Sequence, residues 1–229
     1  MKIAALICAK QKSKGLKNKN IKIFNGQPLI SRTIRQAIAY KKFDRIIVST
    51  DSKKIINIAK NLGVEAPFIR PSNLCRDKSN EWLVWQHALT FMKKKLNYFP
   101  DILVILPVTA PLREMADIKN SISFFCKNSF DSLISITNSS KNPFFNMVKI
   151  KGKQVNKIFK NKNFIRRQDA PKVFAVSTVI YIVKSNFLSK YNSIWKGNIT
   201  SFFVKPENAI DIDTSLDFKF AEYIHKLKK

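Results

Sequence analysis

The sequence has little of what marks an exported, disulfide-bonded or membrane-spanning protein. Its three cysteines, Cys8, Cys75 and Cys126, are odd in number, far apart and outside any CxxC or Cys/His spacing, so neither a disulfide framework nor a zinc site is predicted. No apolar run approaches the roughly 18 residues that cross a bilayer, and the opening MKIAALICAK is too short for a signal peptide. We therefore expect a cytoplasmic protein with no membrane partner.

Acidic residues are also scarce. The chain has 15 Asp and Glu against 42 Lys and Arg, which gives a formal net charge of +27. Such an excess predicts attraction to polyanions and association that weakens with salt. The lysines are spread over the whole length without a concentrated basic tail, so the charge alone does not distinguish a solvated surface from an anion-binding one.

Linkers and repeats are absent as well. With five glycines and no Gly/Ser-rich tract, low-complexity segment or internal repeat, the sequence shows no domain boundary. A chain of 229 residues that is 45% hydrophobic can bury one sizeable core. We expect residues 1–229 to form a single domain.

Short apolar runs alternate with helical patterns along most of the chain. Their length and composition predict buried strands at Ile3–Cys8, Arg45–Ser49, Ile102–Leu106 and Ser132–Ile136. Apolar spacing predicts helices at Pro28–Tyr40, Ser52–Leu62, Glu81–Leu96 and Asp117–Phe125. This order favours an α/β fold, a Rossmann-like doubly wound domain with a mostly parallel sheet, whose ligands bind at the carboxyl ends of the strands.

The alternation is interrupted at residues 143–172. This stretch, with NPFFNMVKIKGK and NKNFIRRQDAPK, is aromatic, contains glycine and is typical of a hairpin, so we interpret it as an inserted arm. Two more strands, Val176–Val183 and Ser201–Val204, and a helix that begins at Thr214 with a capping box to Asp217 are predicted to complete the fold.

The loop after the first strand is suited to phosphate. AKQKSKGLKNKN, from Ala9 to Asn20, contains five lysines and one glycine. Gly15 lets the backbone approach a ligand closely, and Lys14 supplies a charge for a triphosphate. Neither GxxxxGK[ST] nor GxGxxG is present, and a solvated lysine-rich loop is the alternative interpretation.

A pair of aspartates near the carboxyl end offers a metal site. In IDID, an extended backbone would place Asp211 and Asp213 on one side and Ile210 and Ile212 on the other. Two carboxylates beside a phosphate loop suit Mg²⁺, which takes its other ligands from phosphate and water. An alternating strand end produces the same D-x-D pattern without any metal.

Several blocks together resemble one enzyme family. ICAKQKSKGLKNKN with GQPLI, FDRIIVSTD, IRPSNLCRD, LPVTAPLR, RRQDAPKVF and PENAIDIDTSLDF are similar, in order and spacing, to the motifs of the acylneuraminate cytidylyltransferases. The likeness covers almost the whole chain. It implies a Rossmann-like fold whose protruding arm, residues 143–172, mediates dimerisation, and an activity that joins CMP from CTP to a sialic-acid-like nonulosonic acid with the help of Mg²⁺.

The resemblance also implies roles for individual residues. The catalytic group would comprise Lys14, Asp213 as general base or through a metal-bound water, and Arg166. The residues expected to bind the nucleotide are Lys10, Lys14, Asn20, Arg70 and Ser79. Metal binding falls to Asp211 and Asp213, and the sugar site to Arg166, Arg167 and Gln168 on the arm, acting across a homodimer.

Some positions depart from the family pattern. Lys10 stands where the family usually has Arg, Pro107 and Val108 replace a Gln-Pro pair that meets the substrate, and residues 176–178 replace an Asn-Gly turn near the sugar. Lys10 keeps the charge of the family's Arg but not its bidentate fork for phosphate, so this change bears on nucleotide affinity. The changes at residues 107–108 and 176–178 lie on the sugar side, so we expect a modified acceptor such as legionaminic acid, and NPFFNMV and RRQDAPK resemble that branch.

Two alternatives remain open at this point. One is a cytidylyltransferase of the same fold that uses Kdo or pseudaminic acid. The other is a basic nucleic-acid-binding protein, which would leave the IDID pair and the Arg166–Gln168 cluster without a purpose. We therefore expect CTP and an acid sugar as partners, and no nucleic acid.

Overall fold

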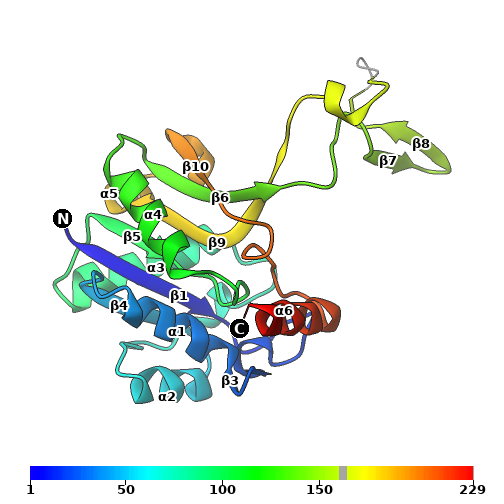
Figure 1. The fold of residues 1–229 in the computed structure, drawn as a ribbon. Coiled ribbons are helices and arrows are strands. Elements are labelled where there is room, and N and C mark those ends of the chain that lie inside the picture. The colour runs from blue at the N-terminus through cyan, green and yellow to red at the C-terminus, as the bar shows by residue number, and fades with distance from the viewer. Residues whose placement is uncertain (160–163, 229) are drawn as a thin grey trace.

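The computed structural model describes residues 1–159 and 164–228, and a six-stranded sheet forms its centre (Figure 1). The strand order is β10-β6-β9-β5-β1-β4. β1 pairs in parallel with β4 and β5, and β10 pairs in parallel with β6, whereas β9 runs antiparallel to both of its neighbours. The predicted α/β fold with a mostly parallel sheet is confirmed, with one antiparallel strand inserted between β5 and β6.

The elements follow the predicted alternation closely. The sheet consists of β1 (Ile3–Ala9), β4 (Arg45–Thr50), β5 (Ile102–Ile105), β6 (Ser132–Asn138), β9 (Phe174–Lys184) and β10 (Ile199–Phe203). The helices are α1 (Leu29–Ala39), α2 (Lys53–Asn61), α3 (Glu81–Lys95), α4 (Met115–Cys126), α5 (Ser185–Lys190) and α6 (Ser215–Leu227). Two short strands, β2 (Ile23–Phe24) and β3 (Gln27–Pro28), form a hairpin before α1.

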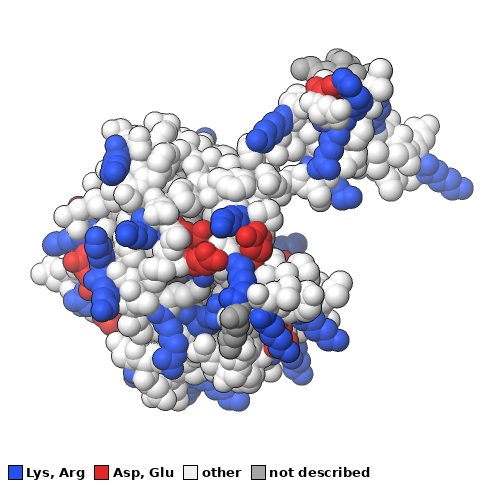
Figure 2. Space-filling view, in the orientation of Figure 1, with Lys and Arg blue, Asp and Glu red and all other residues white. Residues whose placement is uncertain are grey.

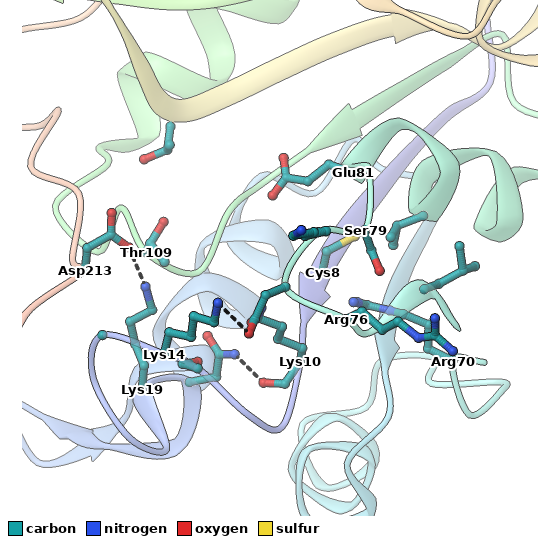
Figure 3. A pocket seen from close by; sticks show the side chains of 18 of the residues that line it. Cys8, Lys10, Lys14, Lys19, Arg70, Arg76, Ser79, Glu81, Thr109 and Asp213 are labelled. Carbon is teal, nitrogen blue, oxygen red and sulfur yellow. Dashed lines mark hydrogen bonds and ion pairs between the residues drawn. The ribbon is translucent and has the colours of Figure 1, made fainter. Parts of the chain in front are cut away.

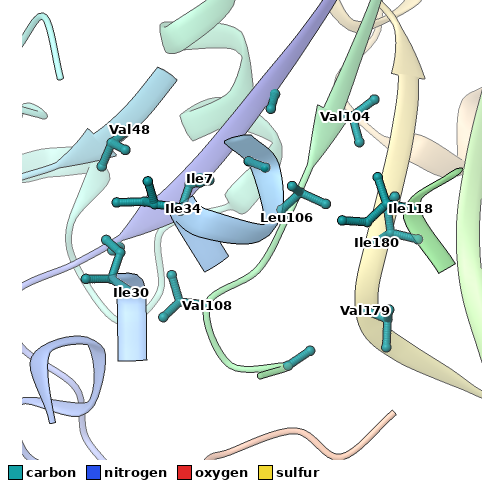
Figure 4. Packing of buried hydrophobic residues seen from close by; sticks show 14 of the residues in the cluster. Ile7, Ile30, Ile34, Val48, Val104, Leu106, Val108, Ile118, Val179 and Ile180 are labelled. Atoms are coloured by element: carbon teal, nitrogen blue, oxygen red, sulfur yellow. The ribbon is translucent and has the colours of Figure 1, made fainter. Parts of the chain in front are cut away.

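The core has one layer on each face of the sheet, because alternate residues of a strand point to opposite faces. Ala5 and Ile7 of β1 belong to a cluster with α1, α2, α4 and α6, part of which is drawn in Figure 4. Ala4 and Leu6 belong to a second cluster, with α3 and α5. All four of these side chains are fully buried, so β1 contributes to both layers of the core.

Capping residues fix where the helices next to the cavity begin. The side chain of Asn80 accepts a hydrogen bond from the backbone N–H of Trp82 at the start of α3. Thr214 and Asp217 form the predicted capping box of α6. Each such cap stabilises a helix by about 1 kcal/mol and fixes the position of the residue beside it, Glu81 in α3 and Asp213 before α6.

The chain between Asn138 and Phe174 projects from the body of the protein (Figure 1). It carries the hairpin of β7 (Val148–Lys151) and β8 (Gln154–Lys157), which turns at Gly152, and several of its large apolar side chains are exposed. The predicted arm, residues 143–172, lies within this projection, and its residues 160–163 lie outside the described part. That the arm mediates dimerisation stays a prediction.

No helix in residues 1–159 and 164–228 combines the length and the apolar character that crossing a membrane requires.

Candidate functional site

A cavity of about 550 Å³ opens at the carboxyl ends of β1 and its neighbours. Figure 3 shows side chains that line it from the loop after β1, from the start of α3 and from the segment before α6. Its lining consists of Cys8, Lys10, Ser13, Lys14, Gly15, Lys19, Asn20, Arg70, Leu74, Arg76, Asp77, Lys78, Ser79, Glu81, Val84, Trp85, Thr109, Thr178, Asp211 and Asp213. This is where a doubly wound sheet is expected to bind its ligand.

The loop of residues 9–20, which we call the lysine loop, meets the segment of Asp211 and Asp213, which we call the acidic segment, in this cavity. The two are almost 200 residues apart in sequence. Lys14 and Asp213 both line it. The lining also includes every predicted nucleotide-binding and metal-binding position. The structure therefore brings these residues together, while the role of each stays a prediction.

Gly15 lies against the backbone of the acidic segment. A Cβ atom added at this position would stand 2.2 Å from the carbonyl oxygen of Asp213. Real Cβ atoms do not approach backbone so closely, so only glycine allows the loop to pack here. The absence of a side chain at Gly15 thus determines how close the lysine loop comes to Asp213.

Lys19 forms a second link between the loop and the acidic segment. Its Nζ donates a hydrogen bond of 2.5 Å to the carbonyl oxygen of Ile212 and one of 2.8 Å to Oδ1 of Asp213. The lysine is buried, so little water competes with these bonds. The sequence offered Lys19 only as one of five lysines, because its partners lie beyond residue 210.

The alternation predicted for IDID is confirmed. Ile212 is fully buried and its N–H donates to the carbonyl oxygen of Thr109, 2.8 Å away, while Asp211 and Asp213 both line the cavity. Oδ1 of Asp211 is buried and has no hydrogen-bond partner among the described residues. A buried carboxylate oxygen without a donor is costly unless a ligand supplies one, and Mg²⁺ meets that need.

A metal ion in this cavity would need ligands from phosphate or water in addition to those from the protein. Within residues 1–159 and 164–228, no cluster of three or more His, Cys, Asp or Glu side chains could hold a metal by itself. Mg²⁺ usually takes one or two carboxylates and completes its coordination with phosphate oxygens and water. Asp211 and Asp213 beside a lysine-rich loop therefore fit this metal, provided that a phosphate ligand is present.

Asp77 holds two of the loop lysines. Nζ of Lys10 lies 2.7 Å from Oδ1 of Asp77, and Nζ of Lys14 lies 3.3 Å from its Oδ2. The hydrogen bond from Lys10, with a weaker one from Lys14, lowers the pKa of Asp77 below its ordinary value. The Asp77 carboxylate thus neutralises part of the positive charge that these two lysines bring to the cavity.

Asn20 and Arg70 also shape the cavity wall. Nδ2 of Asn20 donates to the carbonyl oxygen of Lys10 over 2.8 Å and folds the lysine loop back on itself. Arg70 is buried and donates from Nε to the hydroxyl oxygen of Ser49 over 3.0 Å and from Nη2 to the carbonyl oxygen of the same residue. The predicted nucleotide-binding residues thus also hold the loop and the end of β4 in place.

Glu81 adds an acidic group that the sequence analysis did not select. It lines the cavity at the start of α3, and its carboxyl group remains accessible from the cavity. The surrounding protein removes water and raises the pKa of Glu81, and the charge of Asp211 adds to this while those of Arg70 and Lys10 oppose it. Burial likewise raises the pKa of Cys8 to about 12, which disfavours the thiolate that a nucleophile needs.

Of the sugar-side departures from the family pattern, Thr178 lines the main cavity and Pro107 does not. Thr178 lines the cavity with a buried hydroxyl that has no partner in the described part of the chain. Pro107 does not line it; its carbonyl oxygen accepts a 2.7 Å bond from Nη2 of Arg113. Arg113 is buried and also donates from Nε to Val179 and from Nη1 to Gln36, so it ties β9 to the loop after β5.

The predicted sugar-binding cluster lies away from this cavity. None of Arg166, Arg167 and Gln168 lines it. Arg167 and Gln168 instead line a second cavity of about 530 Å³ at the base of the arm, with Asn138, Lys172 and neighbours. Arg166 forms a bidentate pair with Asp169, with distances of 3.0 and 3.1 Å.

The fold and the main cavity define a class of protein. Lysines and arginines line the part of the cavity formed by the lysine loop and residues 70–78, as Lys10, Lys14, Arg70 and Arg76 do in Figure 3. Asp211 and Asp213 line the same cavity, and no cluster of described residues there forms a full metal cage. This arrangement is suited to binding a nucleoside triphosphate with a divalent cation. The fold and the cavity are therefore typical of an α/β enzyme that binds a nucleotide and acts on its phosphates.

Comparison with known proteins identifies the family. The cytidylyltransferase family model matches residues 4–228, and the chain belongs to this family, as predicted. It is 37% identical to CMP-N,N'-diacetyllegionaminic acid synthase of Campylobacter jejuni over 228 residues, 99% of this chain and 96% of that protein. It is 31% identical to the pseudaminic acid cytidylyltransferase of the same species over 229 residues, 99% and 97% of the two chains.

A solved structure supports the fold. CMP:2-keto-3-deoxy-manno-octonic acid synthetase, determined in complex with CTP, superimposes with a TM-score of 0.73 over the full length of both chains at 14% sequence identity. The Rossmann-like architecture is thus shared where the sequences have diverged widely.

Proposed function

We propose that this protein transfers CMP from CTP to the anomeric hydroxyl of a nonulosonic acid, with release of pyrophosphate, and that its acceptor is of the legionaminic acid type. The observation that carries the proposal is the contact between the lysine loop, at Gly15, and the Asp211–Asp213 segment around one cavity. Legionaminic acid is favoured because the relative named for it is more similar than the one named for pseudaminic acid.

The lysine loop would bind the triphosphate. Lys10 and Lys14 exchange the carboxylate of Asp77 for phosphate oxygens, so their charge is already positioned when the nucleotide arrives. Positioned charges of this kind stabilise the negative charge that spreads over phosphate as pyrophosphate leaves. Asn20, Arg70 and Ser79, on the same wall, would contact the rest of the nucleotide.

Asp211 and Asp213 would hold Mg²⁺. When bound there, the metal neutralises charge on the triphosphate. Lys19 orients Asp213 through its 2.8 Å bond to Oδ1, and the buried Ile212 keeps both carboxylates directed into the cavity. Asp213 is also our candidate for the group that accepts the proton of the acceptor hydroxyl, a contribution typically worth about 10²–10⁴ in rate.

The acceptor would bind beside Thr178 and Glu81. Nucleotide positions account for the lysine loop and for residues 70–79, which leaves the buried Thr178 hydroxyl and the Glu81 carboxylate to face the sugar. Both groups can form hydrogen bonds with hydroxyl or acetamido groups. Thr178 is one of the departures from the family pattern, in agreement with a modified sugar.

A homodimer would complete the acceptor site. Arg166, Arg167 and Gln168 are carried on the projecting arm, so in one copy they do not line the main cavity. The exposed apolar side chains of the arm, including Val148, Ile150 and Val155, suit an interface with a second copy. Mixing inactive Lys14→Ala protein with inactive Arg166→Ala protein should restore turnover if the arm of one copy serves the cavity of the other; no restoration would refute the shared site.

The function is tested with purified protein, CTP, Mg²⁺ and a panel of legionaminic, pseudaminic, N-acetylneuraminic and Kdo acids. We expect a CMP-sugar and pyrophosphate, with the highest kcat/KM for legionaminic acid. Asp213→Asn should lower turnover by about 10² or more at saturating Mg²⁺. Asp101→Asn should not, because this exposed carboxylate lies outside the cavity lining and accepts a hydrogen bond from the N–H of Lys2. Near-normal turnover of Asp213→Asn would remove this residue from the mechanism.

The nucleic-acid alternative predicts a different result. Retention of single-stranded or duplex nucleic acid at physiological salt, together with no CTP turnover on any acid of the panel, would favour it. The family membership and the acidic pair in the cavity argue against that outcome.

A further inference from the structure

A small cavity lies between the lysine loop and the start of α2, apart from the main cavity. Its volume is about 70 Å³. A water molecule takes up roughly 30 Å³ in the liquid, so there is room for a small ion but not for a sugar or a nucleotide. We call it the α2 cavity, and its lining consists of Gln11, Asn18, Asn20, Ile21, Ser52, Lys54 and Ile55.

The first turn of α2 presents free backbone donors beside this cavity. The first N–H groups of an α-helix have no carbonyl partner within the helix. Those of Lys53, Lys54 and Ile55 donate to no acceptor in the described part of the chain, and the first turn contains no acidic side chain. Such a helix start carries partial positive charge and favours an anion.

Ser52 supplies a second and independent sign of a ligand. The residue is only 4% exposed, and it lines the α2 cavity. It stands at the N-cap of α2, where a serine side chain usually accepts from a backbone N–H of the first turn, but here it forms no such bond. Its own N–H is held by the hydroxyl oxygen of Thr50, 3.1 Å away. The Ser52 hydroxyl is therefore enclosed, held in place and free to donate to a ligand in the cavity.

The lysine loop closes the other side of the α2 cavity. The amide groups of Gln11 and Asn18 belong to its lining and can donate hydrogen bonds. Asn20 also lines it, although Nδ2 of this residue is engaged with the carbonyl oxygen of Lys10. A ligand here would thus contact the lysine loop from behind.

The charges around the α2 cavity favour an anion over a cation. Lys54 lines it, and none of the described lining residues is acidic. Asp51 precedes Ser52 but lies outside the lining, and its Oδ1 accepts from the N–H of Gln11 over 2.7 Å. Figure 2 shows Lys and Arg side chains over the lower part of the body, where Figure 1 draws α2.

We propose that the α2 cavity binds one inorganic phosphate ion, through the Ser52 hydroxyl, the free N–H groups of the first turn of α2 and the Lys54 ammonium group. Hydrogen bonds from charged or aligned donors to phosphate are among the stronger ones in proteins. The site is separate from the one proposed for CTP, because Asn20 is the one described residue that lines both cavities. Bound phosphate would tie the lysine loop to α2.

The test is equilibrium dialysis of the purified protein against radiolabelled inorganic phosphate, with and without saturating CTP and Mg²⁺, and without an acceptor sugar. We expect one equivalent of phosphate per chain that CTP does not displace. Ser52→Ala should weaken this binding about tenfold, because a hydrogen bond to a charged ligand is lost. The measurement needs no turnover, so it can succeed or fail independently of the proposed function.

Two further variants locate the site. Ser52→Asp places a carboxylate at the N-cap, so it should abolish phosphate binding and raise Tm in phosphate-free buffer. Lys54→Gln should weaken phosphate binding, whereas the matched control Lys53→Gln, at an exposed lysine outside the cavity lining, should bind like the unaltered protein. Ser52→Ala should keep its Tm in phosphate-free buffer, because the hydroxyl forms no helix cap.

Three outcomes would overturn the proposal. The first is that no phosphate remains bound once CTP is present. The second is that Ser52→Ala and Ser52→Asp bind phosphate as tightly as the unaltered protein. The third is a clear fall in Tm of Ser52→Ala without phosphate, because that would assign the hydroxyl to capping α2 and not to a ligand.

Discussion

Substituting Gly15 with alanine tests the contact on which the site depends. The added methyl group would lie 2.2 Å from the carbonyl oxygen of Asp213, where ordinary contact begins at 3.4 Å, so the lysine loop and the acidic segment must move apart by about 1 Å. Neither side can yield by rotating a side chain, because the clash is with backbone. A displacement of this size in an active site costs about 10² in rate.

The expected result is therefore a fall of about 10² in kcat/KM for CTP, accompanied by a weaker apparent affinity for Mg²⁺ because Asp213 moves. Pyrophosphate release measured over a range of CTP and Mg²⁺ concentrations gives both values. Gly63→Ala is the matched control: its positive φ of 75° makes alanine costly by about 1 kcal/mol, yet nothing lies within 4 Å of the added methyl group. Near-normal kinetics of Gly15→Ala, or an equal loss in Gly63→Ala, would refute the reasoning.

Three further substitutions follow from the contacts described above. Asp77→Asn should lower the KM for CTP by a small factor, because the amide competes less well than a carboxylate for the two loop lysines, and steady-state kinetics showing a large rise in KM would contradict this. Arg113→Met should lower the free energy of unfolding in urea by about 2–5 kcal/mol, because buried carbonyl oxygens lose their donors, whereas exposed Arg35→Met should change it by less than about 0.5 kcal/mol. Glu81 has a raised pKa, so its ionisation in the folded protein costs stability that grows as the pH rises from the ordinary value of 4.5 through the folded pKa. Glu81→Gln should therefore raise Tm at pH 7 and have no effect well below pH 4.5; a lower Tm at pH 7 would be the contrary result.

Local signals were enough to predict most of the fold. Runs such as Ile102–Leu106 and the capping box at Thr214 depend on nearby residues, and the structure places the strand and the helix start within one residue of them. The direction of β9 could not be predicted, because the apolar composition of Val176–Val183 suits a buried strand whether it runs parallel or antiparallel to its neighbours. Its place between β5 and β6 depends on where the arm returns the chain.

The site was predictable where a motif is contiguous and not where partners are distant. The lysine loop and IDID were recognised because their residues lie next to each other in sequence. Lys19, Asp77 and Glu81 were missed because each is distinguished only by neighbours that the fold supplies. Lys19 finds its carboxylate 194 residues away, and no pattern within one segment could reveal it.

The two legs of the arm are continuations of β6 and β9, which stay hydrogen-bonded up to the pair Asn138 and Phe174. The regular pairing runs back along β9 as far as Ser177 and then shifts register, so Thr178 at the cavity wall lies where the ladder between β6 and β9 is irregular. The strand that leaves the projecting arm, β9, thus also supplies part of the wall of the main cavity. Binding at the tip of the arm would therefore reach the acceptor side of the cavity through the four pairs from Asn138–Phe174 to Ser135–Ser177, and the register shift beside Thr178 is where that path leaves regular pairing.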